Sequence, residues 1–150
     1  MGIELLERVD LFRSIPPEGI AHLAERGTSR RFAAGEFLMR QDEASSTMFV
    51  ILSGRVRVAR ALPNEGAVVL AELGPGDVVG EMGLLDRAPR SATVTAIEPT
   101  QALEIHATAL AVVLIEYPEV ATALLRTLSH RLRTTDELVE EMSRRQAERS

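Results

Sequence analysis

The sequence predicts an α+β protein in which an eight-stranded antiparallel β jelly roll or barrel lies between short N-terminal helices and a long C-terminal helix. Two observations predict this class. Between residues 28 and 106 the chain consists of short apolar or alternating runs separated by turn residues, which is typical of antiparallel sheets. Towards both ends the apolar residues instead recur every three or four positions, which is typical of amphipathic helices.

The segment 1–27 predicts two short helices on the outside of a sheet. Leu5, Val9 and Phe12 recur at four- and three-residue steps, so they share one helical face. Two consecutive prolines beginning at Pro16 then interrupt this pattern, because proline lacks a backbone N–H and clashes with the preceding helical turn.

The segment 28–106 predicts the β-roll. Its strands are separated by turn sequences rich in Gly, Pro, Asn and Asp. In one strand Val56 and Val58 alternate with Arg55 and Arg57, which indicates one face towards the interior and one solvated face rather than a nucleic-acid site. The expected strands cover residues 29–33, 37–40, 47–52, 55–61, 68–73, 78–79, 92–97 and 101–105.

The segment 107–145 predicts two further helices. Thr108 is expected to cap a short helix that ends near Leu114. Pro118 suits the first turn of the next helix, which is expected to continue to about Arg145.

The last of these helices carries a heptad seam, whose a and d positions need a partner helix, so a homodimer through this helix is expected. Thr135 occupies a d position, where an apolar residue would pack best. Either its hydroxyl bonds back to the helix and the residue sets the register, or the residue contacts a ligand. The seam comprises Ala121, Leu125, Leu128, Leu132, Thr135, Val139 and Met142.

The stretch 80–94 predicts a phosphate site. Glycines flank Glu81 where a helical turn is expected to begin, and the unpaired N–H groups of such a turn attract an anion. Arg90 adds a guanidinium that can hold two phosphate oxygens, and Ser91 adds a hydroxyl donor. Since a carboxylate repels phosphate, Glu81 fits only as an acceptor for a neighbouring sugar hydroxyl. Phosphate, arginine and ribose acceptor together indicate a nucleotide.

These residues resemble the phosphate-binding cassette of cyclic-nucleotide-binding domains, the family of catabolite activator protein and of the regulatory subunits of cAMP-dependent kinase. The resemblance extends from about Leu6 to about Met142. The length fits a single domain over residues 1–150, and because the N-terminus does not resemble a signal peptide the cytoplasm is the expected location. The resemblance implies a regulatory module and not an enzyme. Its ligand would be cAMP, with cGMP as the less favoured alternative, and no cofactor or metal would be needed.

The resemblance also implies roles for individual residues. Glu81 would bind the ribose 2′-hydroxyl, and Arg90 and Ser91 would bind the cyclic phosphate. The backbone of Met82 and Gly83 would complete the cradle around the phosphate, and Gly80 is also expected to belong to the ligand site.

On the final helix, the resemblance implies that Thr135 contacts the purine. Asp136 stands where related sequences carry a serine, so its role in the ligand site is open; an ion pair with Arg131 across a dimer interface is the alternative. A second departure from the family lies in the turn Gln41-Asp42-Glu43, where many members have glycine in place of Asp42. Because aspartate tolerates a left-handed backbone better than most residues, the turn is expected to be retained.

Composition limits the other classes of function. The net charge of −5 opposes direct binding to nucleic acid. His22, His106 and His130 are scattered, which argues against a cupin-like metalloenzyme on a similar jelly roll, and no apolar run is long enough to span a membrane. A domain of the same fold that only dimerises, without ligand, remains an alternative. The sequence leaves open which effector is regulated and whether the chain is a stand-alone sensor or a fragment.

Overall fold

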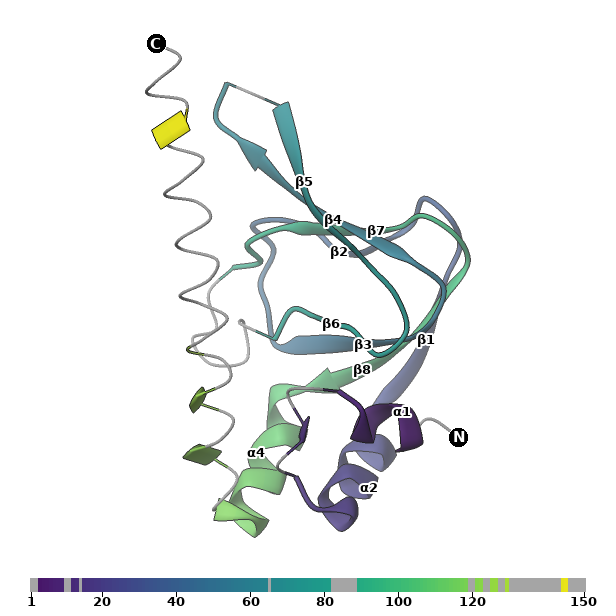
Figure 1. The fold of residues 1–150 in the computed structure, drawn as a ribbon, viewed down its shortest axis with the longest axis vertical. Helices are drawn as coiled ribbons and strands as arrows, with labels where there is room; N and C mark the ends of the chain where they lie inside the picture. Colours follow the sequence, from purple (N-terminus) through teal and green to yellow (C-terminus); the bar gives the residue numbers. More distant parts are fainter. Residues whose placement is uncertain are drawn as a thin grey trace.

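The computed structural model describes residues 3–9, 12–13, 15–64, 66–81, 89–118, 121–122, 125–126, 129 and 144–145. It confirms the predicted jelly roll, with eight strands in two antiparallel sheets of order β1-β8-β3-β6 and β2-β7-β4-β5 (Figure 1). The strands are β1 (Thr28–Phe32), β2 (Phe37–Met39), β3 (Thr47–Ser53), β4 (Val56–Leu62), β5 (Gly66–Leu73), β6 (Val78–Val79), β7 (Thr93–Ala96) and β8 (Thr100–His106).

Three helices lie together beside the first sheet: α1 (Ile3–Glu7), α2 (Pro17–Arg26) and α4 (Ala107–Glu116) (Figure 1). The expected break between the N-terminal helices is present, because Pro16 is extended and Pro17 opens α2. Proline is well accommodated there, since the first helical N–H has no partner within the helix.

The prediction that Thr108 caps a helix is wrong. Strand β8 continues to His106, which lies opposite Thr47 in the register, and α4 begins at the next residue, Ala107. Thr108 is therefore inside the helix, and His106 occupies the N-cap position without a side-chain hydrogen bond. The strand runs directly into the helix because Ala107 donates its backbone N–H to the carbonyl of Ser46 at 2.9 Å.

Strand β3 separates two hydrophobic layers. Met48 and Val50 point into the layer between this sheet and the helices, whereas Phe49 and Ile51 point into the layer between the two sheets. Successive side chains of a strand face opposite sides, so a strand buried on both faces contributes to both layers.

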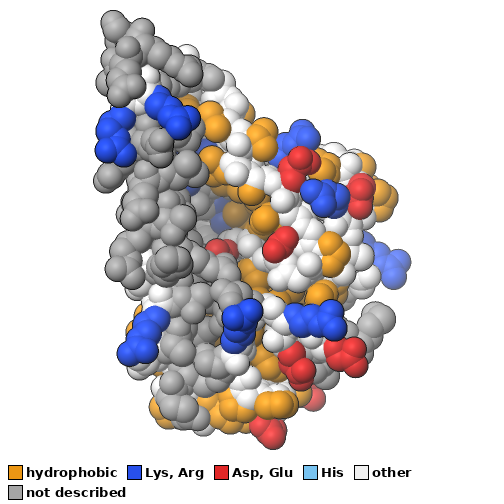
Figure 2. Space-filling view, in the orientation of Figure 1, with side chains coloured by type: hydrophobic (Ala, Val, Ile, Leu, Met, Phe, Trp, Pro, Cys, Tyr) orange, Lys and Arg blue, Asp and Glu red, His pale blue; other side chains and the backbone are white. Residues whose placement is uncertain are grey.

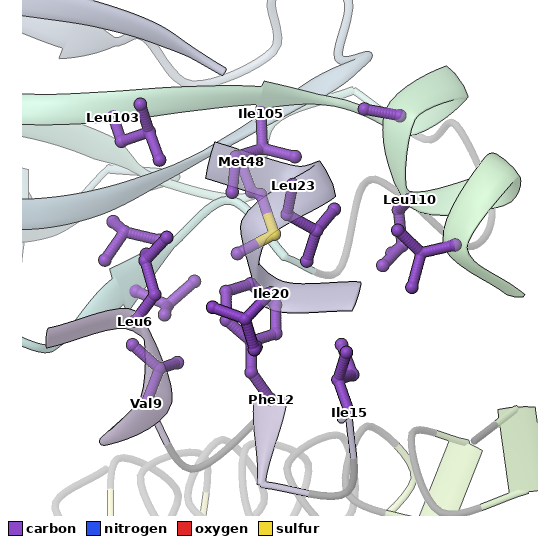
Figure 3. Packing of buried hydrophobic residues seen from close by; sticks show 14 residues of the cluster. Leu6, Val9, Phe12, Ile15, Ile20, Leu23, Met48, Leu103, Ile105 and Leu110 are labelled. Carbon is purple, nitrogen blue, oxygen red and sulfur yellow. The ribbon is translucent and has the colours of Figure 1, made fainter. Parts of the chain in front are cut away.

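The helix-side layer gathers residues from several strands, the three helices and the N-terminal loop (Figure 3). Figure 3 shows Met48 and Ile105 directed from the sheet towards Ile20 and Leu23 of α2. All four of these side chains are at most 1% exposed. Burying an aliphatic side chain of this size stabilises a fold by about 1.5–3 kcal/mol, so this layer holds the helices on the sheet.

Beyond Tyr117, the few residues that the structure describes are helical, as expected for the final helix. Of the predicted seam, only Ala121 and Leu125 are among them, so the dimer stays a prediction. In the described part of the chain, no helix combines the length and the apolar character that a membrane span requires.

We expect Gly54→Ala to lower the free energy of unfolding by about 2–4 kcal/mol in urea denaturation. Gly54 has a φ of 92°, and a Cβ there would lie 2.5 Å from both the carbonyl oxygen of Pro99 and the hydroxyl of Thr100. Gly35 is the matched control, because it has the same φ of 92° but a Cβ there would meet nothing within 4 Å. Gly35→Ala should cost only about 1–2 kcal/mol, the conformational part alone. Equal losses in the two variants would show that the close contact at Gly54 has no energetic weight.

Candidate functional site

The site begins where β6 ends. Gly80 follows Val79 directly, with a φ of 83° that side-chain-bearing residues rarely adopt. A Cβ on Gly80 would lie 2.5 Å from Nη1 of Arg90 and 3.2 Å from the carbonyl oxygen of Thr47. Both the backbone conformation and the close approach of the guanidinium therefore require glycine at this position.

Arg90 is buried, at 8% exposure, beside Gly80. Its Nη1 donates to the carbonyl oxygen of Thr47 at 2.7 Å and makes a longer contact of 3.5 Å with the carbonyl oxygen of Gly80. Its Nη2 donates to the hydroxyl of Thr47 at 3.1 Å. The structure thus brings together Gly80 and Arg90, two residues of the stretch 80–94 that the sequence predicts as a phosphate site.

Burial lowers the pKa of the Arg90 guanidinium below its ordinary value, while the nearby carboxylates of Glu104 and Glu43 act in the opposite direction. Desolvation disfavours the charged form, whereas a neighbouring negative charge favours it. Since arginine remains protonated in proteins, the site contains a desolvated positive charge.

Two donors of Arg90 remain for a ligand. A guanidinium has five N–H donors, and the bonds described above engage both hydrogens of Nη1 and one of Nη2. Within the described part of the chain, Nε–H and the second Nη2–H have no acceptor. A pair of parallel donors of this kind binds two oxygens of a phosphate or carboxylate.

The backbone of Arg90 is held by the turn that follows β2. Arg90 donates its N–H to the carbonyl of Glu43 at 2.8 Å, and its own carbonyl accepts from the N–H of Asp42 at 2.8 Å. Asp42 has a φ of 71°, so the turn keeps the left-handed residue that related sequences supply with glycine. The expectation that aspartate can replace glycine there is met by the geometry.

The strand after Arg90 is anchored on two sides. The exposed Ser91 accepts a hydrogen bond at its carbonyl from Nε of Arg60 at 2.9 Å. The N–H of Gln41 donates to the hydroxyl of Thr93 at 3.0 Å, and the Gln41 amide bonds to both backbone groups of Ala61. These contacts connect the end of the cassette to β4 and to the turn after β2.

Four of the predicted ligand-binding residues lie within the described structure: Gly80, Glu81, Arg90 and Ser91. Glu81 is half-buried and directly follows Gly80. The other four, Met82, Gly83, Thr135 and Asp136, lie outside the described residues.

Thr47 and Glu104 are site residues that the sequence patterns did not reveal. Thr47 is 6% exposed and donates its hydroxyl hydrogen to Oε2 of Glu104 at 3.1 Å. The available signal was a polar residue beside apolar ones in each strand, namely Thr47 before Met48 and Glu104 between Leu103 and Ile105. That pattern marks an unusual residue but does not identify its partner.

Potential metal ligands and the distribution of charge bear on other functions in the described part of the chain. Among the described residues, no three His, Asp or Glu side chains come together as metal ligands would. On the face shown in Figure 2, arginine and acidic side chains are interspersed over the described surface. A polyanion site typically gathers its cations into a stripe or patch.

The site thus combines an antiparallel roll with a buried arginine beside a glycine, and two of the arginine donors are not engaged within the described residues. Such an arrangement is suited to a domain that binds a phosphorylated ligand. The family model for the cyclic nucleotide-binding domain matches residues 29–117, more than half of the chain, and the protein belongs to this family.

Two curated relatives and one solved domain illustrate the similarity. The chain is 31% identical over 133 residues to the "CRP-like cAMP-activated global transcriptional regulator" of Mycobacterium tuberculosis, covering 89% of this chain and 59% of that protein. It is 32% identical over 126 residues to the "Cyclic AMP receptor protein" of Thermus thermophilus, covering 84% and 58% of the two chains. The solved N-terminal domain of a transcriptional regulator from Streptomyces coelicolor superposes with a TM-score of 0.75 at 34% identity, covering 89% and 95%. The chain thus spans about three-fifths of the length of the two curated relatives.

We expect Gly80→Ala to weaken cyclic-nucleotide binding at least tenfold, because its methyl group would displace the Arg90 guanidinium. Gly76→Ala is the matched control: Gly76 has a φ of 89°, and a Cβ there would meet only Cδ1 of Leu5 at an ordinary 3.6 Å. Both variants should lose about 1–2 kcal/mol of folding stability from the backbone conformation. Only Gly80→Ala should lose affinity in calorimetric titration, and equal affinities would contradict the importance of the close approach.

Proposed function

We propose that this domain is a regulatory sensor that binds cAMP at Arg90 and transmits binding through its C-terminal helix. The observation that carries the proposal is the buried Arg90 guanidinium, which has acceptors on one side and two uncommitted donors among the described residues on the other. A cyclic nucleotide carries one negative charge on its phosphate, which complements one buried cation.

The electrostatics support this pairing. Because the guanidinium is desolvated, its attraction to an anion is stronger than in bulk water, where the same pair at 4 Å is worth only about 1 kcal/mol. The guanidinium loses its hydration when the protein folds. A bound phosphate then replaces part of the interaction that the guanidinium made with water in the unfolded chain.

The remaining contacts follow from positions next to Arg90. Ser91 is exposed and adjacent, so its hydroxyl is available as a further phosphate donor. Glu81 follows Gly80 and is assigned to the ribose 2′-hydroxyl, with the backbone of Met82 and Gly83 completing the phosphate cradle.

The base is proposed to be adenine. In this family a threonine directly after the cassette arginine often favours cGMP, and this chain has Ser91 there, without the methyl group that helps to position such a contact. The two curated relatives named above are described as cAMP-activated and as a cyclic AMP receptor, which supports the same choice.

Transmission is assigned to the final helix. Thr135 would contact the purine, Asp136 would lie beside it or pair across a dimer, and the nucleotide would bias the helix between two positions. A homodimer through the heptad seam would present this movement to an effector. From the transcriptional relatives we extend only the regulatory role to this chain. The effector is left open, because the chain spans only part of the length of those relatives.

The test is calorimetric titration of cAMP and cGMP into protein that has been unfolded and refolded to remove co-purified nucleotide. We expect tighter binding of cAMP than of cGMP. Arg90→Ala should lose about 2–5 kcal/mol of binding free energy, as expected when one member of a desolvated charge pair is removed. Arg57→Ala is the control, because Arg57 is exposed and pairs with Glu72 at 3.6 Å on the solvated strand face. Refolded wild type that binds neither nucleotide would indicate a ligand-free interaction domain instead.

A second test concerns Glu81. If its carboxylate accepts the ribose 2′-hydroxyl, wild type should bind 2′-deoxy-cAMP about tenfold more weakly than cAMP, while Glu81→Ala should bind the two ligands about equally. Equal affinities of wild type for the two ligands would remove this role from Glu81 and leave the phosphate assignment intact.

A further inference from the structure

We propose that Thr47 and Glu104 are positioning residues for Arg90, and that together they set the direction in which its two free donors point. This proposal rests on the proposed function, because the donors that are positioned, Nε–H and the second Nη2–H of Arg90, are the ones assigned to the phosphate. Neither residue is expected to touch the nucleotide.

The two residues share one face of the first sheet. Glu104 of β8 lies opposite Phe49 of β3 in the register, and Thr47 lies two residues before Phe49. Since side chains alternate along a strand, Thr47, Phe49 and Glu104 point to the same side. This is the side of the layer between the sheets, because Phe49 belongs to that layer.

Thr47 binds the guanidinium at two points. Its carbonyl accepts from Nη1 at 2.7 Å, and its hydroxyl accepts from Nη2 at 3.1 Å. Two bonds from different nitrogens of a planar group fix both its tilt and its rotation. The edge that carries Nε–H and the second Nη2–H is thereby held in one direction.

Glu104 determines which way the Thr47 hydroxyl points. A hydroxyl has a single hydrogen, and that of Thr47 is donated to Oε2 of Glu104 at 3.1 Å. The oxygen lone pairs are then left facing Nη2 of Arg90. Without the carboxylate the hydroxyl could rotate and donate elsewhere, and the second bond to the guanidinium would become intermittent.

Arg30 engages the second carboxylate oxygen of Glu104. Its Nη1 donates to the other carboxylate oxygen, Oε1, at 2.9 Å, and the Arg30 and Glu104 side chains are 47% and 16% exposed. With both oxygens engaged, the carboxylate favours the charged form of Arg90 through space but does not occupy the donors assigned to the phosphate. A carboxylate bound directly at those donors would compete with the ligand.

The experiment compares Thr47→Val, Thr47→Ser and Glu104→Gln by calorimetric titration with cAMP. Thr47→Val keeps the branched shape but removes the hydroxyl, and it should weaken binding about tenfold, as for the loss of one hydrogen bond to a charged group. Thr47→Ser keeps the hydroxyl and should bind within about threefold of wild type. Glu104→Gln should weaken binding in the same direction, and adding it to Thr47→Val should have little further effect, because both changes disrupt one chain of bonds.

Thr100→Val is the matched control. Thr100 is a threonine of the same sheet, 4% exposed, whose hydroxyl donates to the carbonyls of Arg55 and Glu98, away from Arg90. Its loss should reduce folding stability but leave the affinity for cAMP unchanged. If Thr47→Ser weakened binding as much as Thr47→Val, or Thr100→Val weakened it equally, the positioning role would be overturned.

A second readout is independent of the nucleotide. In nitrogen-15 spectra of arginine side chains, the Arg90 signals, assigned by their absence in Arg90→Lys, should show hindered rotation about Cζ–Nη in wild type and fast rotation in Thr47→Val. If wild type binds no cAMP but this change occurs, the proposed function fails and the positioning holds. If wild type binds cAMP while Thr47→Val changes neither the affinity nor the signals, the positioning fails and the proposed function holds.

Discussion

The burial of one positive charge is the constraint on which the site depends. Arg90 is almost completely withdrawn from solvent, and its desolvation would destabilise the fold without compensating groups. Those groups come from distant parts of the chain: a carbonyl and hydroxyl from Thr47, the carbonyl of Gly80, and the turn that contains Asp42. Gly80 has no side chain because the guanidinium occupies that space, and Asp42 adopts a left-handed conformation because the turn must reach the Arg90 backbone.

The compensation has two parts with different consequences. Neutral acceptors contact the guanidinium directly and satisfy hydrogen bonds, but they carry no net charge. The carboxylates of Glu104 and Glu43 contribute through space without a direct bond to it among the described residues. The cation is therefore compensated within the fold, yet among the described residues no carboxylate forms a direct ion pair with it. An anionic ligand gains most from binding where it meets no such partner that must first be displaced.

Much of the fold could be predicted because short alternating runs and turn residues are local signals, and all eight strands were expected close to their observed positions. Gly80 and Arg90 could be expected to lie together because they belong to one short stretch, whereas the ligand roles of Glu81 and Ser91 stay predictions. Thr47 and Glu104 could not be predicted, because strand register brings Thr47 to Arg90 across 43 residues and to Glu104 across 57 residues. The cap at Thr108 was wrong for a related reason: how far β8 continues is decided by its pairing with β3, which helix-capping preferences do not contain.

Strand β8 continues directly into α4 without an intervening loop, so the two elements are connected rigidly. Glu104 lies three residues before Ala107, the first residue of the helix, and Ala107 is bonded to Ser46, the neighbour of Thr47. Both residues that orient the arginine are therefore within a few bonds of the base of α4, with no loop between them to absorb displacement. A displacement of α4 would therefore be passed directly to the two strands that hold Arg90.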